Sequence, residues 1–180
     1  ANMKFRVIVE TQQEFDQWVD DYASPSLEPI GEAIQGAALF VSKGCTLCHK
    51  QDGAETIALR EFQRQSFLDG NPVVPGPNLT NFATRTTMAA GILPLTEQNL
   101  LQWLRDPDDV KPGNRMSELA AVYNNPDLAL TEDDISALTA YLLRLSPDIG
   151  ATFSTPTPIV LPTSTPPPTP GGPTMPTQAP

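Results

Sequence analysis

The residues of this sequence best suited to chemistry stand side by side. The chain has 180 residues, and its two cysteines and its one histidine form the run Cys45-Thr46-Leu47-Cys48-His49. In a C-x-x-C-H motif the two thiols can add across the vinyl groups of a haem while the adjacent imidazole becomes an axial ligand of the iron, which requires the three residues to be this close. The motif therefore predicts one covalently attached haem c on Cys45, Cys48 and His49.

Other chemistries of such a motif fit this chain less well. A structural zinc site has four ligands, whereas cysteine and histidine supply three here at most. A thioredoxin-like pair would stand in a βαβ context, and helical patterns flank this pair. An enzyme remains the alternative from another class. A haem peroxidase would need an open sixth position on the iron, and a thiol oxidoreductase would have to spare Cys45 for its own chemistry.

Composition and charge narrow the class of partner. The chain carries 21 acidic and 11 basic residues, a net charge of −10, and residues 31–149 alone hold 15 acidic and 9 basic side chains. This balance argues against a nucleic-acid backbone and favours a cationic partner, such as a basic donor cytochrome. No apolar run approaches the roughly 20 residues that a membrane-spanning helix needs.

Three helices are expected to position the motif. Apolar residues at helical spacing mark them: Ala33, Gly36, Ala37 and Phe40 in the first, Leu100, Leu101 and Leu104 in the second, and Ile135, Leu138, Tyr141 and Leu142 in the third. Gly44 ends the first helix just before the motif. The second begins at the N-cap Thr96 and ends before Pro107, and the third runs from Thr131 to about Leu145. The sequence therefore predicts a mostly α-helical domain over residues 32–149.

Residues 1–22 have a different pattern. Residues 3–10 alternate between apolar and polar side chains, which predicts a half-buried strand. A capping-box signature at Thr11 and Glu14 then opens a short helix. Its apolar face carries Phe15, Trp18 and Val19. Because a lone strand and a short helix cannot make a stable sheet, we expect this segment to be the end of a domain that begins upstream.

Two further segments lack a hydrophobic pattern. Residues 23–31 contain Pro25 and Pro29 and are expected to form an extended linker. Residues 150–180 are rich in proline and threonine and cannot bury enough surface to offset chain entropy. We expect a disordered Pro/Thr-rich tail there.

The helices and the motif together resemble a class I cytochrome c. Gly36 and Phe40 in the first helix, with Leu138 and Tyr141 in the last, resemble the crossing of first and last helices in that family. Gly76-Pro77-Asn78-Leu79 resembles the family's loop after the haem motif. The resemblance implies that the carbonyl of Pro77 accepts the proton on the second imidazole nitrogen, a bond that fixes the ring of a ligating histidine.

The sixth ligand of the iron is expected to be a methionine, because His/Met ligation raises the redox potential of a haem. Met3 and Met175 lie at the two ends of the chain, outside the helical domain. Met88 stands in what looks like a short helical segment and is interpreted as a core residue. Met116 follows the loop 111–115, Lys-Pro-Gly-Asn-Arg, which suits a ligand presented from an irregular loop. The family resemblance supplies the position and favours Met116.

Two more residues acquire a role through this resemblance. Arg85, after the Gly-Pro-Asn-Leu loop, and Trp103, in Trp-Leu-Arg-Asp-Pro, resemble the family's partners of the haem propionates. Without the resemblance they would be interpreted as a surface arginine and a core tryptophan. A buried indole N–H usually finds a hydrogen-bond partner, which adds a physical reason for Trp103.

A second resemblance indicates which cytochrome this is. Residues 3–18 resemble the C-terminal end of the cupredoxin-like β-sandwich that holds the binuclear copper centre in subunit II of haem-copper oxidases. It implies that Met3 is a copper ligand, only in the complete subunit, since the other copper ligands would precede Ala1. Residues 32–147 resemble the cytochrome c domain fused behind subunit II in caa-type oxidases. Two departures are Ser117, where a proline commonly follows the ligand, and a long insertion over 50–75 with a small helix expected around Ile57–Gln65.

These observations predict an electron-transfer module on the extracytoplasmic face of a bacterial plasma membrane. Haem c on His49 and Met116 would take electrons from a donor cytochrome and pass them to the copper centre of an oxidase, together with the other oxidase subunits. Nothing in this chain reduces oxygen itself. A free-standing or dehydrogenase-linked monohaem cytochrome c is the alternative.

Overall fold

The computed structural model describes residues 7–51, 61, 64–65, 67–70 and 76–147. Within them the chain is mostly helical, with short 3-10 helices labelled η. The helices are α1 (Gln12–Ala23), α2 (Glu32–Ser42), η1 (Cys45–Leu47), η2 (Phe82–Thr84), α4 (Glu97–Arg105), α5 (Pro107–Val110), α6 (Arg115–Leu119), α7 (Ala121–Asn124), η3 (Pro126–Leu128) and α8 (Glu132–Leu142). Strands β1 (Thr87–Met88) and β2 (Leu93–Pro94) form an antiparallel hairpin. None of the described helices is long and apolar enough to cross a membrane.

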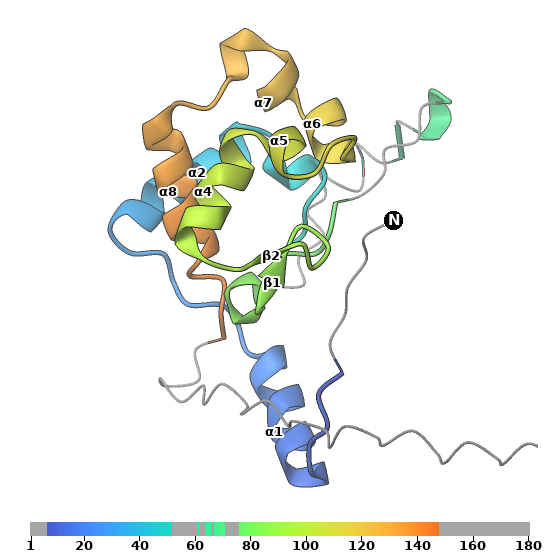
Figure 1. Cartoon of the computed structure of the whole chain (residues 1–180), viewed down its shortest axis with the longest axis vertical. Helices are drawn as coiled ribbons and strands as arrows, with labels where there is room; N and C mark the ends of the chain where they lie inside the picture. The colour runs from blue at the N-terminus through green and yellow to red at the C-terminus, as the bar shows by residue number, and fades with distance from the viewer. Residues whose placement is uncertain (1–6, 52–60, 62–63, 66, 71–75, 148–180) are drawn as a thin grey trace, which may run out of the picture.

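The core lies where α8 packs against α2 and α4, while α1 stands apart from the rest below the hairpin (Figure 1). A Cβ added to Gly36 of α2 would lie 1.9 Å from the carbonyl oxygen of Ala137 and 2.6 Å from Cβ of Tyr141, both on α8. The rings of Phe40 and Tyr141 meet at a centroid distance of 5.6 Å. The expected crossing of first and last helices is confirmed, and only glycine allows the backbones to approach so closely.

The predicted helix boundaries are largely confirmed. Thr96 caps α4 by accepting the N–H of Asn99, and Thr131 forms a capping box with Asp134 at the start of α8. Pro107 follows α4 as predicted, but it is also the first residue of α5, where its missing N–H is not needed. Helix α8 ends at Leu142 rather than near Leu145. The N–H groups of Arg144 and Leu145 then donate three residues back, to Tyr141 and Leu142, as in a tight turn.

The segment around Met88 was predicted to be helical, and this is wrong. Met88 ends β1 and pairs with Leu93 across a turn in which Ala89, Ala90 and Gly91 all have positive φ, at 52°, 62° and 79°. Three successive left-handed residues cannot continue a right-handed helix. Met88 is nevertheless only 6% exposed and belongs to the hydrophobic core, as interpreted.

The N-terminal predictions are met in part. The capping box of α1 is present, with the Thr11 side chain accepting from the N–H of Glu14 and the Glu14 carboxylate accepting in return. Residues 7–10 are not in a strand, because no described segment pairs with them. Met3 and the tail 150–180 lie outside the described residues, as does most of the small helix expected over Ile57–Gln65.

Candidate haem site

Cys45 is the first residue of η1, which begins three residues after the end of α2, and Cys48 is the C-cap of η1. Gly44 adopts φ +78°, and this left-handed residue turns the chain from the end of α2 into η1. Cys45 and Cys48 are free thiols and not a disulfide. Burial raises the pKa of Cys45 to about 11 and also raises the pKa of Cys48. Both side chains are therefore neutral thiols near pH 7.

The imidazole of His49 is held in one tautomer. Its Nδ1 lies 2.8 Å from the carbonyl oxygen of Pro77. Because a carbonyl oxygen can only accept, Nδ1 carries the hydrogen and Nε2 keeps its lone pair. Burial lowers the pKa of His49 and the nearby charge of Arg85 lowers it further, while the bond to Pro77 acts in the opposite direction. A neutral ring with a free Nε2 is the state in which histidine binds a metal.

Gly76 brings its backbone against the same ring. A Cβ added there would lie 2.5 Å from Cε1 and 2.7 Å from Nδ1 of His49. The N–H of Gly76 donates to the carbonyl of Cys48 at 2.9 Å, and the N–H of Leu79 donates to the carbonyl of Lys50 at 2.7 Å. The Gly-Pro-Asn-Leu loop thus pairs with the chain that leaves the motif. The sequence placed Gly76 in this loop but did not predict that the imidazole excludes any side chain.

Met116 is the second residue of α6. This is a short helix, whereas an irregular loop was expected. Asn114 makes the difference: its side chain accepts the N–H of Ser117 at 2.9 Å and so caps a new helix. The amide of Asn114 also donates to the carbonyl of Lys111 at 3.0 Å, which closes the preceding loop. Met116 is partly buried and packs against the hydrophobic core.

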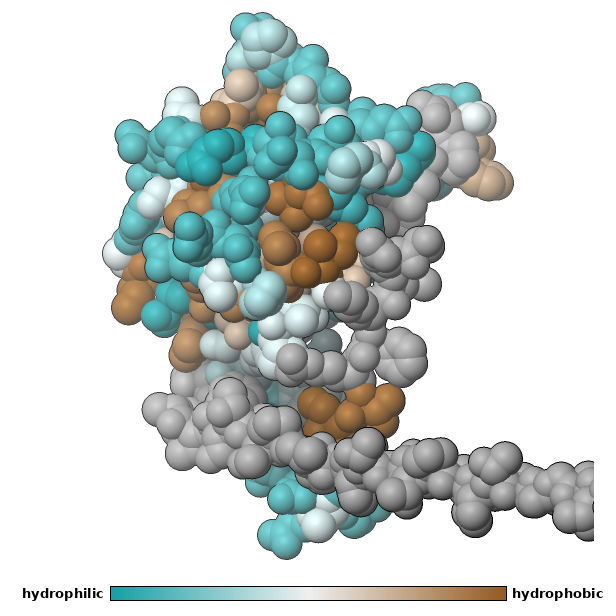
Figure 2. Space-filling view, in the orientation of Figure 1, coloured by the Kyte–Doolittle hydropathy of each residue, from teal (hydrophilic) through white to brown (hydrophobic). Residues whose placement is uncertain are grey.

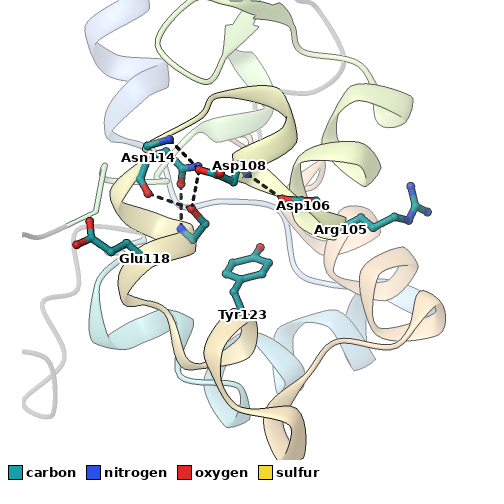
Figure 3. Close-up of a pocket in the computed structure, with 8 residues that line it drawn as sticks. Arg105, Asp106, Asp108, Asn114, Glu118 and Tyr123 are labelled. Atoms are coloured by element: carbon teal, nitrogen blue, oxygen red, sulfur yellow. Dashed lines mark hydrogen bonds between the residues drawn. The ribbon is translucent and has the colours of Figure 1, made fainter.

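A network of polar side chains supports this loop from one side. The carboxylate of Asp108 accepts the N–H of Gly113 at 2.7 Å and lies 3.4 Å from the hydroxyl of Ser117. Figure 3 shows Asp108 and Asn114 directed toward each other beside an open surface pocket of about 600 Å³. Ser117, at the position where the family commonly has proline, also donates to the carbonyl of Asn114 at 3.0 Å.

Asn124 of α7 supports the end of α6, the helix that carries Met116. The amide of Asn124 donates to the carbonyls of Ser117, Glu118 and Ala120 at 2.9, 3.2 and 3.0 Å. The sequence analysis missed the roles of Asp108, Asn114 and Asn124. An asparagine before a short helical run was a usable signal for the cap at Asn114. Nothing local indicates Asn124.

Arg85 and Trp103 lie near different parts of the site. The guanidinium of Arg85 donates to the carbonyl of Asn78 and stacks over the ring of Phe82 at 5.4 Å, on the His49 side. Trp103 is partly buried and packs against the same core as Met116. Its indole N–H makes no hydrogen bond to any other residue of the described part.

The residues present fit a haem. The donor set comprises two free thiols, an imidazole with a free Nε2 and a thioether, which is the set that c-type haem uses. Apolar side chains from four segments are only partly covered by the core: Cys45, Leu93, Leu95, Leu101, Trp103 and Met116. Figure 2 shows an apolar area between α4 and the β1–β2 hairpin. A flat apolar ring attached to the thiols would cover such surface.

Comparisons with known proteins agree with this site. Residues 33–146 match the family described as cytochrome c, so the chain belongs to the cytochrome c family. Membership of this family implies a covalently bound haem.

Particular relatives extend the similarity beyond the helical domain. Cytochrome c oxidase subunit 2 of Bacillus sp. (strain PS3) is 36% identical over 147 residues, which is 81% of this chain and 35% of that protein. The same subunit of Alkalihalophilus pseudofirmus is 34% identical over 146 residues, and that of Bacillus subtilis (strain 168) is 32% identical over 148 residues, with the same coverage. This chain therefore spans about a third of the length of these relatives.

Proposed function

We propose that this chain is the cytochrome-bearing part of a cytochrome c oxidase subunit 2, and that it carries electrons singly from a donor to the copper centre of that oxidase. The proposal rests above all on the tautomer of His49, whose Nδ1 is bonded to Pro77 and which directly follows two free thiols in the C-x-x-C-H run. The relatives supply the context, since each is a cytochrome c oxidase subunit 2 that matches 81% of the chain.

Each site residue then has a defined task. The bound haem supplies a one-electron carrier that cycles between ferrous and ferric iron. Cys45 and Cys48 would hold the porphyrin through thioether bonds, formed when each S–H adds across a vinyl group so that the sulfur bonds one vinyl carbon and the hydrogen bonds the other. His49 gives Nε2 to the iron, with Pro77 fixing its ring. Met116 would supply its thioether as the second protein ligand of the iron, and His/Met ligation favours a high potential.

Arg85 and Trp103 are proposed to bind the propionates. Arg85 offers a cation on the His49 side, where its guanidinium donates to the carbonyl of Asn78 and lies over the ring of Phe82. Trp103 offers an indole N–H that no described residue accepts. Burial lowers the pKa of Arg85, so an anionic partner would stabilise its charged form.

The copper centre belongs to the complete protein. Residues 1–22 are proposed to be the end of the copper domain, with Met3 among its copper ligands. The complete subunit would lie on the extracytoplasmic side of a bacterial plasma membrane with the other oxidase subunits. Reading the gene upstream of Ala1 tests this assignment, because a copper domain requires a C-x-x-x-C run and a histidine before Met3. Their absence would leave a free-standing or dehydrogenase-linked cytochrome c.

A basic cytochrome is the proposed donor. The segment that carries Met116 is net acidic. Between residues 106 and 118 it holds Asp106, Asp108, Asp109 and Glu118 against Lys111 and Arg115, of which Arg115 pairs with Glu118 at 2.9 Å. Long-range attraction between opposite charges accelerates encounter and is screened by salt. Electron uptake from a basic donor should therefore slow as ionic strength rises. A rate that rises with salt would mean an acidic donor.

Extraction with acid-acetone tests the covalent attachment of the haem, which is the core of the proposal. The chain expressed with haem maturation should carry one haem that acid-acetone does not extract. The double variant Cys45→Ala, Cys48→Ala should release its haem under the same treatment. Haem retained by the double variant would overturn the assignment of the site.

A further inference from the structure

Residues 22–28, which follow the exposed part of α1, are bonded to the helical domain along their length, and we call them the strap. The N–H of Leu27 donates to the carbonyl of Ser146 at 2.9 Å, and Ser26 forms a β-bridge with Pro147. The guanidinium of Arg144 donates to the carbonyl of Glu28 at 2.9 Å. An extended linker between independent domains was expected here, but these bonds hold the strap against the chain that leaves α8.

Asn81 holds the other end of the strap. Its side-chain amide donates to the carbonyl of Tyr22 at 2.9 Å, although the two residues are 59 positions apart. Tyr22 is the penultimate residue of α1, and the last carbonyls of a helix have no partner within the helix. Asn81 thus caps the C-terminus of α1 from another part of the chain.

The conformation of Asn81 indicates that this bond is specific. Asn81 is 1% exposed and has φ 54°, a left-handed conformation that asparagine adopts more readily than most residues. The backbone carbonyl of Asn81 accepts a hydrogen bond from the hydroxyl of Thr84 at 2.8 Å, which fixes the turn over residues 81–84. The residue lies four positions after Pro77, in the loop that orients His49. The end of α1 is therefore bonded to the loop that positions the proposed iron ligand.

One face of α1 is apolar and only about half covered. The rings of Phe15, Trp18 and Tyr22 stack in sequence, with centroid distances of 5.9 and 5.1 Å, and each residue is 44–48% exposed. Figure 2 shows further apolar atoms over the segment before α1, where Val7 and Val9 are three-quarters exposed. Under the proposed function the copper domain of the same protein covers this face, since the matched relatives are almost three times as long as the matched segment.

We infer that Asn81 and the strap latch α1 to the haem-bearing loop, so that the copper and cytochrome domains form one fixed arrangement. Domains joined by a free linker move relative to each other. The rate of electron transfer would then be limited by how often the two domains come into contact. With the latch, the rate does not depend on such motion, because the partner domain is fixed to α1. Asn81 acts here as a positioning residue, and only the identity of the partner domain rests on the proposed function.

The latch is tested by following the motion of α1 in the reduced, haem-loaded 180-residue chain. Nitrogen-15 relaxation of the α1 amides should give order parameters near 0.85, as for a rigid backbone, and Asn81→Gly should lower them below about 0.6. Glycine removes the side chain without straining the positive φ. The matched control is Asn99→Ala, which removes an asparagine bond of 2.9 Å to the carbonyl of Pro94 and should leave α1 rigid.

A second variant guards against damage to the haem loop. Arg144→Met breaks the bond to Glu28 without touching the loop, and it should also increase the motion of the strap and α1. The absorption spectrum should stay unchanged in this variant. An α1 that moves independently in the unaltered chain, or that stays rigid in both variants, would overturn the latch.

The complete subunit separates this inference from the proposed function. There, Asn81→Gly should slow electron transfer from haem to copper and make its rate depend on solvent viscosity. If α1 is freed but that rate is unchanged, the latch stands and the assignment of the copper domain as its partner is wrong.

Discussion

His49 and Met116 are held by different kinds of contact. Around His49 the contacts are made by backbone: the carbonyl of Pro77, the paired Gly76 and the 2.5 Å limit on any added Cβ. Around Met116 they are made by side chains, with Asp108, Asn114 and Asn124 bonding the loop on two sides.

This difference predicts how each side of the site fails. A backbone cradle leaves no room for change, so a single added methyl group is expected to abolish it. In a network of several exposed side-chain hydrogen bonds, the loss of one bond removes only part of the stability, because each bond contributes about 0.5–1.5 kcal/mol. The histidine side should therefore behave as all-or-none and the methionine side as graded.

The largest effect is expected from Gly76→Ala. The new methyl group would overlap the imidazole of His49, and the resulting overpacking should lower the free energy of unfolding by about 3 kcal/mol or prevent haem attachment. The matched control is Gly113→Ala in the methionine loop, where nothing lies within 4 Å and only the φ of +74° is strained, at about 1–2 kcal/mol. Thermal unfolding and haem content measure both. Equal losses in the two variants would contradict the contrast between the two sides.

Met116→Ala should have the next largest effect, and on the spectrum rather than the fold. Loss of the thioether should remove the weak red absorption band of Met-ligated ferric haem and lower the redox potential. Met88→Ala should keep the band and the potential, yet destabilise the domain by about 2–5 kcal/mol because Met88 is buried in the core. If the band disappears with Met88 instead, the iron ligand has been assigned to the wrong methionine.

Asp108→Ala should give a graded loss on the methionine side. The N–H of Gly113 loses its acceptor, which is expected to weaken the loop by about 1 kcal/mol. The red band should then persist at low temperature and disappear at a lower temperature than in the unaltered chain. Asp109→Ala is the control, since among the described residues the carboxylate of Asp109 accepts only a long 3.4 Å contact from Gln102. An unchanged thermal transition in Asp108→Ala would show that the network does not hold Met116.

The two sides also differ in how well the sequence predicts them. Features set by local patterns were predicted: the motif and the caps at Thr96 and Thr131. The bond from His49 to Pro77 joins residues 28 positions apart and was expected only from the family resemblance. A consecutive motif or a cap depends on residues within one turn, so local chemistry determines it.

Contacts between segments that are far apart in the sequence were not predicted. Asn124 reaches three carbonyls and Asn81 reaches Tyr22 only because distant segments meet. The hairpin after Met88 was missed for a related reason: alanine favours helices, and nothing in the sequence shows that Ala89 and Ala90 adopt a left-handed turn imposed by packing.

The smallest effect is expected from an ion pair on the histidine side. Lys43, just before the motif, lies 3.4 Å from the carboxylate of Asp134 and also donates to the carbonyls of Leu128 and Ala129 at 3.2 and 3.0 Å. It joins the end of α2 to the start of α8. The pKa of Asp134 is lowered mainly by the backbone N–H of Thr131, with Lys43 adding to the shift.

The sign of the pH dependence follows from this lowered pKa. A carboxylate whose folded pKa is depressed stabilises the fold above its unfolded pKa, near 3.9, and loses that contribution as the pH falls through the folded value. Asp134→Asn should therefore lower the free energy of unfolding by about 0.5–1 kcal/mol at pH 7 and by almost nothing near pH 2. Denaturant titration at both pH values measures this difference. Because the red band depends on the methionine side, it should keep its thermal transition in this variant, and a lowered transition would show that the two sides of the site are coupled through α8.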